Sequence, residues 1–322
     1  MEIIALDSEL KEKYPVVIDV DFEAGDSSAR NDFEISAEDV GEYAFYVPGT
    51  EFGGVIEFEE GFTKKKTHTI KGWTWRGLLT QWFIEPDAGS NYKIVKGEAN
   101  SIMGNLLENI LGGFFVVPDV DSGLTIESYQ FKLHCSVLDG FMDMLSSHGY
   151  RLKINAKRTK VGKPISIFCE AVPVKRVEGT YDEDTGLNIA FTNNRMGVNH
   201  LICWGSGQLQ ERQRLDLFLD EEGNISGTQV YFGFHERQAV FDYGNAESLD
   251  DLRQHGMERL REIASSKNLQ IDEVEGVDME IGDIVVGRKN DIGLIVEKPI
   301  VRKILRISDG KTSIEYKVKG EG

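Results

Sequence analysis

Short runs in which apolar and polar residues alternate make up most of the chain. Such alternation predicts strands, because successive side chains on a strand point to opposite faces of a sheet. Residues 1–79 contain short apolar runs, among them Val16–Ile18, Tyr43–Val47 and Gly54–Phe58, and an alternating run at Thr67–Trp75. Polar turn residues separate the runs, so this region is predicted to be β-rich, with a short helix after the last run at Arg76–Trp82.

Residues 80–186 show a different pattern, in which helical spacing alternates with strand spacing. Ser101 precedes apolar residues at helical spacing and is expected to cap a helix that Gly112–Gly113 ends. Ser136 and Asp139 form a capping box in front of a second helix. Strands are predicted at 124–131, 151–156 and 164–171, and a boundary loop at Val177–Asp184. The region is therefore predicted to be an α+β insertion.

Strand patterns return after residue 187. Leu215, Leu217 and Leu219 alternate with polar or aromatic residues, as in a sheet with one buried face. Ser248 with Asp251 predicts a capped helix over 248–265, with Leu249, Leu252, Leu260 and Ile263 along its buried side. In the last 50 residues, 281–287 and 293–296 flank a turn, Asp309–Gly310 predicts a hairpin, and Ile314, Tyr316 and Val318 alternate along the closing strand.

These patterns predict an α+β, mainly β, fold in four parts. The parts are residues 1–79, a first β domain; 80–186, the α+β insertion; 187–270, a second β domain with its helix; and 271–322, a C-terminal β-hairpin region. A chain of 322 residues is long enough for more than one domain.

Composition narrows the function further. The 54 acidic and 36 basic side chains give a net charge of −18. Such a surface repels phosphate backbones and anionic lipids, so tight nucleic-acid binding is disfavoured. Cys135, Cys169 and Cys203 are far apart and odd in number, which predicts reduced, buried thiols in a protein made in a cytosol. No run approaches the length of a membrane span, and Met1–Ile4 lacks the features of a signal peptide.

Several motifs suggest chemistry, but each has a simpler structural explanation. Gly205–Gly207 follows a strand, yet a third glycine, a lysine and a following helix are missing from the pattern of a phosphate loop. Asp119 and Asp121 precede Gly123 at a spacing too short for a calcium loop. The acidic runs at Glu57–Glu60 and Asp182–Asp184 could supply a glycosidase pair, but 54 acids make any pair unspecific.

Histidines and tryptophans complete the set of candidates. His68, His134, His148, His200, His235 and His255 show no metal-binding spacing, and the His134–Cys135–Ser136 run does not by itself make a nucleophile and base. Trp73, Trp75 and Trp82 lie close together in sequence and could stack on sugars. A packed face on one strand shared by Trp73 and Trp75 is the better prediction. We therefore predict no catalytic, cofactor-binding or metal-binding residue.

The order of the parts provides the strongest clue. A strand leads into a helix at Gly72–Leu79, and an α+β insertion follows. A second strand block opens at Asn199–Ile202, passes Gly205–Gly207 and Glu211–Arg212, and enters a helix through Phe241–Ser248. The segment Ile281–Gly287 and a hairpin follow. This arrangement resembles siphophage and prophage tail proteins of the baseplate-hub family, which are related to the N-terminal hub part of tail-associated lysins. Gln81–Trp82 departs from the family pattern, in which basic residues often occupy these positions.

The resemblance implies two tube-type β-barrels and a homotrimer at the distal end of the tail tube. Three subunits with two barrels each match a sixfold tube to a threefold tip. The implied neighbours are the tail tube or distal tail protein and the tail tip or tape measure protein, with genomic DNA in transit through the lumen. The implied location is the virion, after production in the bacterial host cytoplasm, and the implied role is structural, without a cofactor or membrane.

Two other classes of function stay open at this point. The first is a tail-associated peptidoglycan hydrolase or endopeptidase. The chain ends soon after the closing hairpin, at Lys319–Gly322, and we expect it to lack the extension that would carry a hydrolase. The second is a carbohydrate-binding module that uses the tryptophans.

Overall fold

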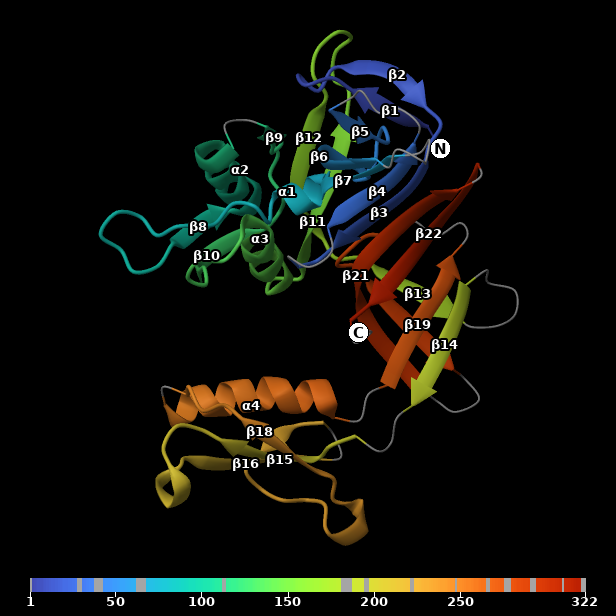
Figure 1. Ribbon diagram of the computed structural model, residues 1–322. Coiled ribbons are helices and arrows are strands. Elements are labelled where there is room, and N and C mark those ends of the chain that lie inside the picture. The colour runs from blue at the N-terminus through green and yellow to red at the C-terminus, as the bar shows by residue number, and fades with distance from the viewer. Residues whose placement is uncertain are drawn as a thin grey trace. The chain divides into compact units, whose positions relative to one another are not determined.

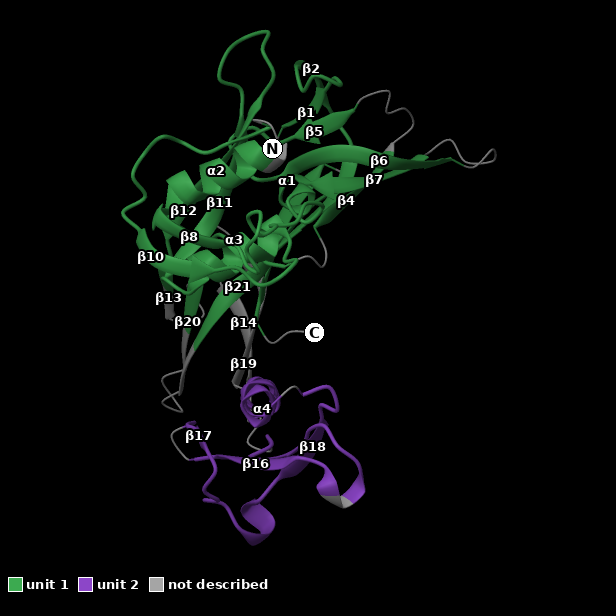
Figure 2. Ribbon diagram, turned by 90° about the vertical axis from the view of Figure 1, so that its left-hand side faces the viewer, with its two compact units in different colours: residues 1–189, 271–319 green, residues 190–270, 320–322 purple. Residues whose placement is uncertain are grey.

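The computed structural model describes residues 2–27, 31–37, 43–61, 68–111, 114–180, 187–193, 197–220, 223–246, 248–264, 267–274, 279–289, 294–308 and 310–319. The chain divides into two compact units (Figure 2). Unit 1 contains residues 1–189 and 271–319, and unit 2 contains 190–270 with 320–322. Strands dominate both units, so the predicted α+β, mainly β, fold is confirmed, whereas the division into four parts with two barrels stays a prediction.

Unit 1 is built on a large curled sheet (Figure 1). Its strand order is β13-β20-β21-β3-β4-β7-β6-β5-β1-β2, and β22 pairs with β21. The strands are β1 (Ile3–Leu6), β2 (Glu12–Val16), β3 (Asp19–Gly25), β4 (Asp32–Ala37), β5 (Ala44–Tyr46), β6 (Gly53–Gly61), β7 (His68–Thr74), β13 (Arg176–Thr180), β20 (Ile284–Lys289), β21 (Leu294–Ser308) and β22 (Lys311–Val318). The N-terminal strands therefore share one sheet with the C-terminal strands.

Alternation along β3 and β4 gives this sheet its core. Phe22 pairs with Phe33, and both side chains are buried, with ring centroids 5.3 Å apart. Phe22 also lies 6.3 Å from the Phe52 ring, and Leu305 of β21 is fully buried beside them. The opposite faces of the same strands are charged and face solvent. Burial of one face of the alternating pattern thus fixes the register of these strands.

The insertion packs its helices and short strands against the N-terminal strands of unit 1. The short helix α1 (Trp75–Leu78) precedes it, and its elements are β8 (Ile94–Glu98), α2 (Ala99–Leu111), β9 (Phe115–Val116), β10 (Thr125–Gln130), α3 (Val137–Ser146), β11 (Tyr150–Lys157) and β12 (Ser166–Pro173). Leu138 and Phe141 of α3 are completely buried in an apolar core that also includes Leu6 of β1 and Trp75 of α1. One apolar core therefore joins the insertion to the N-terminal strands.

Unit 2 is a four-stranded sheet with one long helix. The strand order is β17-β16-β15-β18, with bounds Ile225–Ser226, Arg214–Leu219, His200–Trp204 and Gln238–Asp242. The helix α4 (Leu249–Ile263) packs Leu252 and Leu260 on Leu201, Cys203 and Leu217 of the sheet. Short 3-10 turns lie at η1 (Leu209–Glu211) and η2 (Gly233–His235), and β14 (Leu187–Asn193) pairs with β19 (Lys267–Val274).

The predicted N-terminal caps are confirmed at two helices. Ser136 accepts a hydrogen bond from the backbone nitrogen of Asp139 at 3.0 Å, and Ser248 does the same for Asp251 at 3.1 Å. At the third helix the prediction was wrong, because α2 begins at Ala99 instead of after Ser101. There the Glu98 carboxylate accepts the orphan backbone N–H groups of the first turn.

Three other expectations need correction. Trp75 does not share a strand face with Trp73, because Thr74 caps α1 and makes Trp75 its first residue. The predicted boundary loop at 177–184 is strand β13 up to Thr180, which pairs in parallel with β20, while the rest of the loop lies outside the described residues. Leu249 was predicted to be buried, but 43% of it is exposed at the first position of α4.

Buried charges join distant segments of unit 1. Arg76 donates to Glu51 through Nε at 3.1 Å and Nη2 at 2.8 Å, and each side chain is 2% exposed. Arg151 Nε lies 2.6 Å from Asp283 Oδ1, also in the interior. Lys303 Nζ lies 2.9 Å from Glu280 Oε1. We call these six residues the buried charge cluster.

The neighbouring charges shift the pKa values of the two glutamates of the cluster in opposite directions. Burial alone would raise the pKa of Glu51, but the positive charges of Arg76, Lys303 and Arg151 outweigh it and lower that pKa. At Glu280, burial and the nearby Glu51 charge raise the pKa. The three cations come from α1, β11 and β21, so the cluster holds the N-terminal part, the insertion and the C-terminal strands together.

We predict that Arg76→Met destabilises the protein by about 3–5 kcal/mol, because the Glu51 carboxylate stays buried without its partner. Denaturant unfolding followed by circular dichroism measures the loss. Lys71→Met is the matched control, since it breaks the exposed Lys71–Glu34 pair and should leave the free energy of unfolding nearly unchanged. Equal, small losses for both variants would show that the buried pair does not stabilise the fold.

Glu98 gives a pH-dependent prediction. Burial would raise its pKa, but hydrogen bonds from the Ser122 hydroxyl and from the backbone of Ser122, Asn100 and Ser101 lower it to about 2. Because the folded pKa lies below the unfolded one, the stabilisation is complete above about pH 4.5 and disappears as the pH falls toward 2.

Glu98→Gln should therefore lower the free energy of unfolding by about 1–3 kcal/mol at pH 7, and the difference from wild type should shrink as the pH falls below 4.5. Urea titrations across this range test it. Glu108→Gln, an exposed change on the same helix, should stay within about 0.5 kcal/mol of wild type throughout. A Glu98→Gln deficit that does not change with pH would contradict the assignment.

Candidate functional site

The glycine motif of unit 2 closes a strand connection. Gly205 N donates to Gln213 O at 2.9 Å, and Gln213 N donates to Ser206 O at 2.9 Å. The loop then enters η1 and β16 instead of a helix. The backbone N–H groups of Gly205 and Gln213 are thus already used in hydrogen bonds across the loop. Since no α-helix begins directly after it, the loop has no helix N-terminus at which a phosphate could bind.

The His134–Cys135–Ser136 run does not form a nucleophile and base. Ser136 Oγ donates to Asp139 Oδ2 at 2.7 Å and caps α3, so it holds the start of a helix. Burial raises the pKa of Cys135, which keeps the thiol protonated. Burial also raises the pKa of Cys169 to about 12 and that of Cys203 to about 11. All three cysteines are unpaired, as expected of reduced thiols.

The acidic residues considered for a calcium loop or a glycosidase pair have structural roles wherever the structure describes them. Asp121 Oδ1 accepts from Gly123 N at 2.8 Å in a turn, and Gly123 has a φ of +80°. Glu59 lies on exposed β6, where its carboxylate is 2.7 Å from His68 Nδ1 of β7. Asp182–Asp184 lie outside the described residues. Among the described side chains, no group of three or more His, Cys, Asp or Glu is placed to hold a metal ion.

The tryptophans do not form a joint platform. Trp75 is completely buried, with its ring centroid 6.4 Å from that of Phe114. Trp73 and Trp82 are partly buried against the same core. Because only part of this group reaches solvent, a sugar-stacking face made of Trp73 and Trp75 is excluded.

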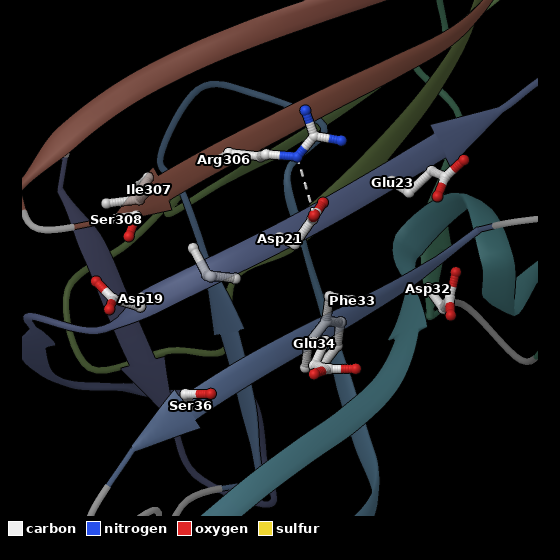
Figure 3. A pocket seen from close by; sticks show the side chains of 11 residues that line it. Asp19, Asp21, Glu23, Asp32, Phe33, Glu34, Ser36, Arg306, Ile307 and Ser308 are labelled. Carbon is white, nitrogen blue, oxygen red and sulfur yellow. Dashed lines mark hydrogen bonds and ion pairs between the residues drawn. The ribbon is translucent and has the colours of Figure 1, made fainter.

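The most distinctive surface of unit 1 is an acidic hollow over β3, β4 and β21, with a volume of about 470 Å³ (Figure 3). Five carboxylates and one guanidinium line it. They belong to Asp19, Asp21, Glu23, Asp32, Glu34 and Arg306. Val20, Phe33 and Ile307 add apolar atoms to the lining. The side chains of Val20 and Phe33 are buried in the core beneath, so the exposed lining of the hollow is mainly acidic.

Strand geometry brings these carboxylates together. Asp19, Asp21 and Glu23 occupy every second position of β3 and face away from the core, as Figure 3 shows. The pairing of Asp21 with Glu34 places the charged side of β4 beside them. The sequence carried this signal as acids at i, i+2 and i+4 beside a second acidic strand, but our sequence analysis did not single it out.

Basic side chains at the rim of the hollow neutralise part of its negative charge. Arg306 Nε lies 3.1 Å from Asp21 Oδ2, and its Nη1 pairs with Glu315 of β22. Arg302 Nη1 lies 2.6 Å from Glu23 Oε1, and Lys71 Nζ lies 2.8 Å from Glu34 Oε2. These pairs join neighbouring strands, whereas Asp32 has no ion-pair partner among the described residues. Negative charge therefore remains in excess within the hollow.

Unit 2 presents a second surface of interest on the sheet face opposite α4. His200 lies between Asp216 and Glu236, with Nε2 2.9 Å from Asp216 Oδ1 and Nδ1 2.6 Å from Glu236 Oε1. Its ring lies 4.2 Å from that of Phe218. The loop around η2 exposes Phe232 and Phe234, and the His235 ring lies 3.7 Å from that of Phe234.

Within the part of the chain that the structure describes, no helix has both the length and the apolar character needed to cross a bilayer.

Comparison with known proteins identifies the fold. No protein-family model matches the chain, and no curated protein matches it. Solved structures do match, and two tail proteins among them align over nearly the whole chain. The 43 kDa tail protein of prophage MuSo2 from Shewanella oneidensis is 13% identical, with a TM-score of 0.55, over 99% of this chain and 98% of that one. The tail protein from Neisseria meningitidis MC58 is 12% identical, with a TM-score of 0.50, over 98% and 95%.

Both alignments run through both units, from the N-terminal strands to the C-terminal hairpin. The order of parts that suggested the resemblance therefore corresponds to a shared three-dimensional arrangement. At these identities the likeness concerns the fold and not individual side chains. The chain thus has the fold of prophage tail proteins, which confirms at the level of structure the resemblance drawn from the sequence.

Proposed function

We propose that this protein is a structural component of a phage tail, a hub that forms a ring at the distal end of the tail tube. The observation that carries the proposal is the alignment with two tail proteins, one of them from a prophage, over 95% or more of every chain involved. A chain that shares its whole length with tail proteins is best explained as a tail protein itself.

Uncovered sheet edges support assembly into a ring. In the described part of unit 1, β2 pairs only with β1, and β22 pairs only with β21. Open edges invite pairing with other chains, and closed rings cover them. Pro15 on β2 and the lysines at both ends of β22, Lys311 and Lys317, are the kind of residue that limits uncontrolled edge pairing. The edges are thus suited to specific neighbours.

The ring in this proposal is a homotrimer, in which two similar barrels per subunit match the sixfold tube to a threefold tip. Its neighbours are the tail tube or distal tail protein on one side and the tip or tape measure protein on the other. The net charge of −18 supports a passage for DNA, because repulsion keeps a polyanion mobile. The protein then resides in the virion after synthesis in the host cytoplasm.

A structural role also agrees with the chemistry of the side chains. The described acids, thiols and hydroxyls singled out above serve as helix caps, turn acceptors, ion-pair partners or buried groups. The alternative of a tail-associated peptidoglycan hydrolase or endopeptidase needs an acid or base in a cleft. The described acid–histidine pairs include Glu59 with His68, both more than a third exposed, and the more buried His200 with Asp216 and Glu236.

Immunogold labelling of intact tail particles tests the proposed location. We expect label at one end of the tail tube and not along its length, because a hub ring occurs once per tail. Antibody to the tube protein serves as the control for even labelling. Label spread along the tube, or confined to free protein, would reject the hub assignment.

Zymography on bacterial cell walls tests the alternative. The purified protein should clear no peptidoglycan, under conditions in which lysozyme gives a clear zone. Clearing by the wild-type protein that is lost in Glu59→Gln or His68→Gln would establish a hydrolase and overturn the structural role.

A further inference from the structure

The tip of the β11–β12 hairpin differs in charge from the rest of the chain. Residues 151–169 contain six basic side chains and no acidic one, in a protein whose net charge is −18. Residues 157–164 at the turn are all exposed, and the hairpin extends beyond the β1–β2 end of the sheet (Figure 1). We call residues 157–164 the basic tip.

Contacts at its base give the basic tip a defined shape. Arg158 forms an ion pair with Glu12 of β2, and Ile165 N donates to Leu10 O at 2.9 Å. Lys157 Nζ lies 4.6 Å from the centre of the Phe168 ring. At the turn, Lys163 N donates to Lys160 O at 3.3 Å, and Gly162 takes the positive φ of +70° that closes it. These contacts fix the position of the apex of the hairpin.

The apex of the tip combines two cations with one apolar side chain. Lys160 and Lys163 flank Val161, which is 86% exposed. Neither lysine has an ion-pair partner in the part of the chain that the structure describes. A surface that fits this apex needs negative charge around an apolar area, because each component then meets its complement.

The acidic hollow of unit 1 supplies the negative charge. Its five carboxylates exceed its one guanidinium, and Val20, Phe33 and Ile307 line its floor, where their side chains are buried or partly buried in the core beneath. The volume of about 470 Å³ leaves room for a valine side chain with the ends of two lysines. Asp19 and Asp32 are exposed at the starts of the antiparallel strands β3 and β4, and so lie on either side of the lining.

Sheet order separates the two surfaces within one molecule. The hollow lies over β21, β3 and β4, whereas the basic tip stands beside β1 and β2, and the strands β7, β6 and β5 come between. A contact between different surfaces of identical chains is head-to-tail, and repetition of such a contact closes into a ring when the rotation allows it.

We propose that the basic tip of one copy docks into the acidic hollow of a second copy, with Val161 in the hollow and Lys160 and Lys163 against its carboxylates. This contact rests on the proposed function, for which it supplies the subunit interface. A nucleic acid is a poorer partner, because the tip carries no aromatic side chain for base stacking and sits on a strongly acidic protein.

Cross-linking between two single variants tests the contact directly. Lys160→Cys protein is mixed with Asp32→Cys protein under mild oxidation, and a disulfide-linked heterodimer is the expected product. Lys96→Cys, which places the thiol at an exposed lysine outside the tip, replaces Lys160→Cys in the control mixture. A heterodimer yield no higher than that of the control would overturn the proposal.

Charge exchange provides the second test. Lys160→Glu with Lys163→Glu should weaken self-association by about tenfold or more in sedimentation experiments at low salt, since like charges then meet in the contact. Asp19→Lys with Asp32→Lys should do the same, and a mixture of the two reversed proteins should associate again. Lys96→Glu should leave association unchanged. Failure of the mixture to recover association would contradict the docking.

Two outcomes distinguish a failure of the docking contact from a failure of the proposed hub function. DNA retention by the wild-type protein, lost in the Lys160→Glu and Lys163→Glu variant, would show that the tip binds nucleic acid and would overturn docking between copies. Absence of the cross-link together with immunogold label at the tube end would reject this interface and leave the hub assignment standing.

Discussion

Unit 1 depends on charges that have been removed from water. Glu51 and Arg76 are almost fully enclosed, and Asp283 is completely so. A buried charge without a partner is so costly that each of these groups requires the others in place. Glu51 comes from the N-terminal region, Arg151 from the insertion, and Asp283 from a segment 132 residues further along the chain than Arg151. The cluster can form only when all three regions have reached their places, so it ties the large sheet and the insertion into one cooperative unit.

The same sheet separates the two roles of its residues by strand alternation. On β3 and β4 the inward side chains form the aromatic core, and the outward side chains form the acidic hollow. Stability and surface chemistry are therefore encoded in alternate positions of the same strands. A surface produced in this way is held by the core beneath it, which suits a component that must present fixed contacts to its neighbours.

Local signals made part of this fold predictable. The capping boxes at Ser136 and Ser248 span four residues each, and the alternation of Ile314, Tyr316 and Val318 is visible within one strand. Signals that depend on distant residues were missed. Thr74 ends β7, although the alternation in the sequence continues through Trp75, and β13 becomes a strand through its pairing with β20, more than 100 residues away. Arg76 and Glu51 would normally be placed on the surface, because charged residues are rarely buried.

The most direct test of the account is a cryo-electron microscopy reconstruction of the native tail tip. The account predicts three copies of this chain in a closed ring at the distal end of the tube, with the two sheet-bearing units of each copy arranged around a channel wide enough for DNA. A reconstruction in which the chain is absent from the tip, or is present there without a closed ring, would contradict it.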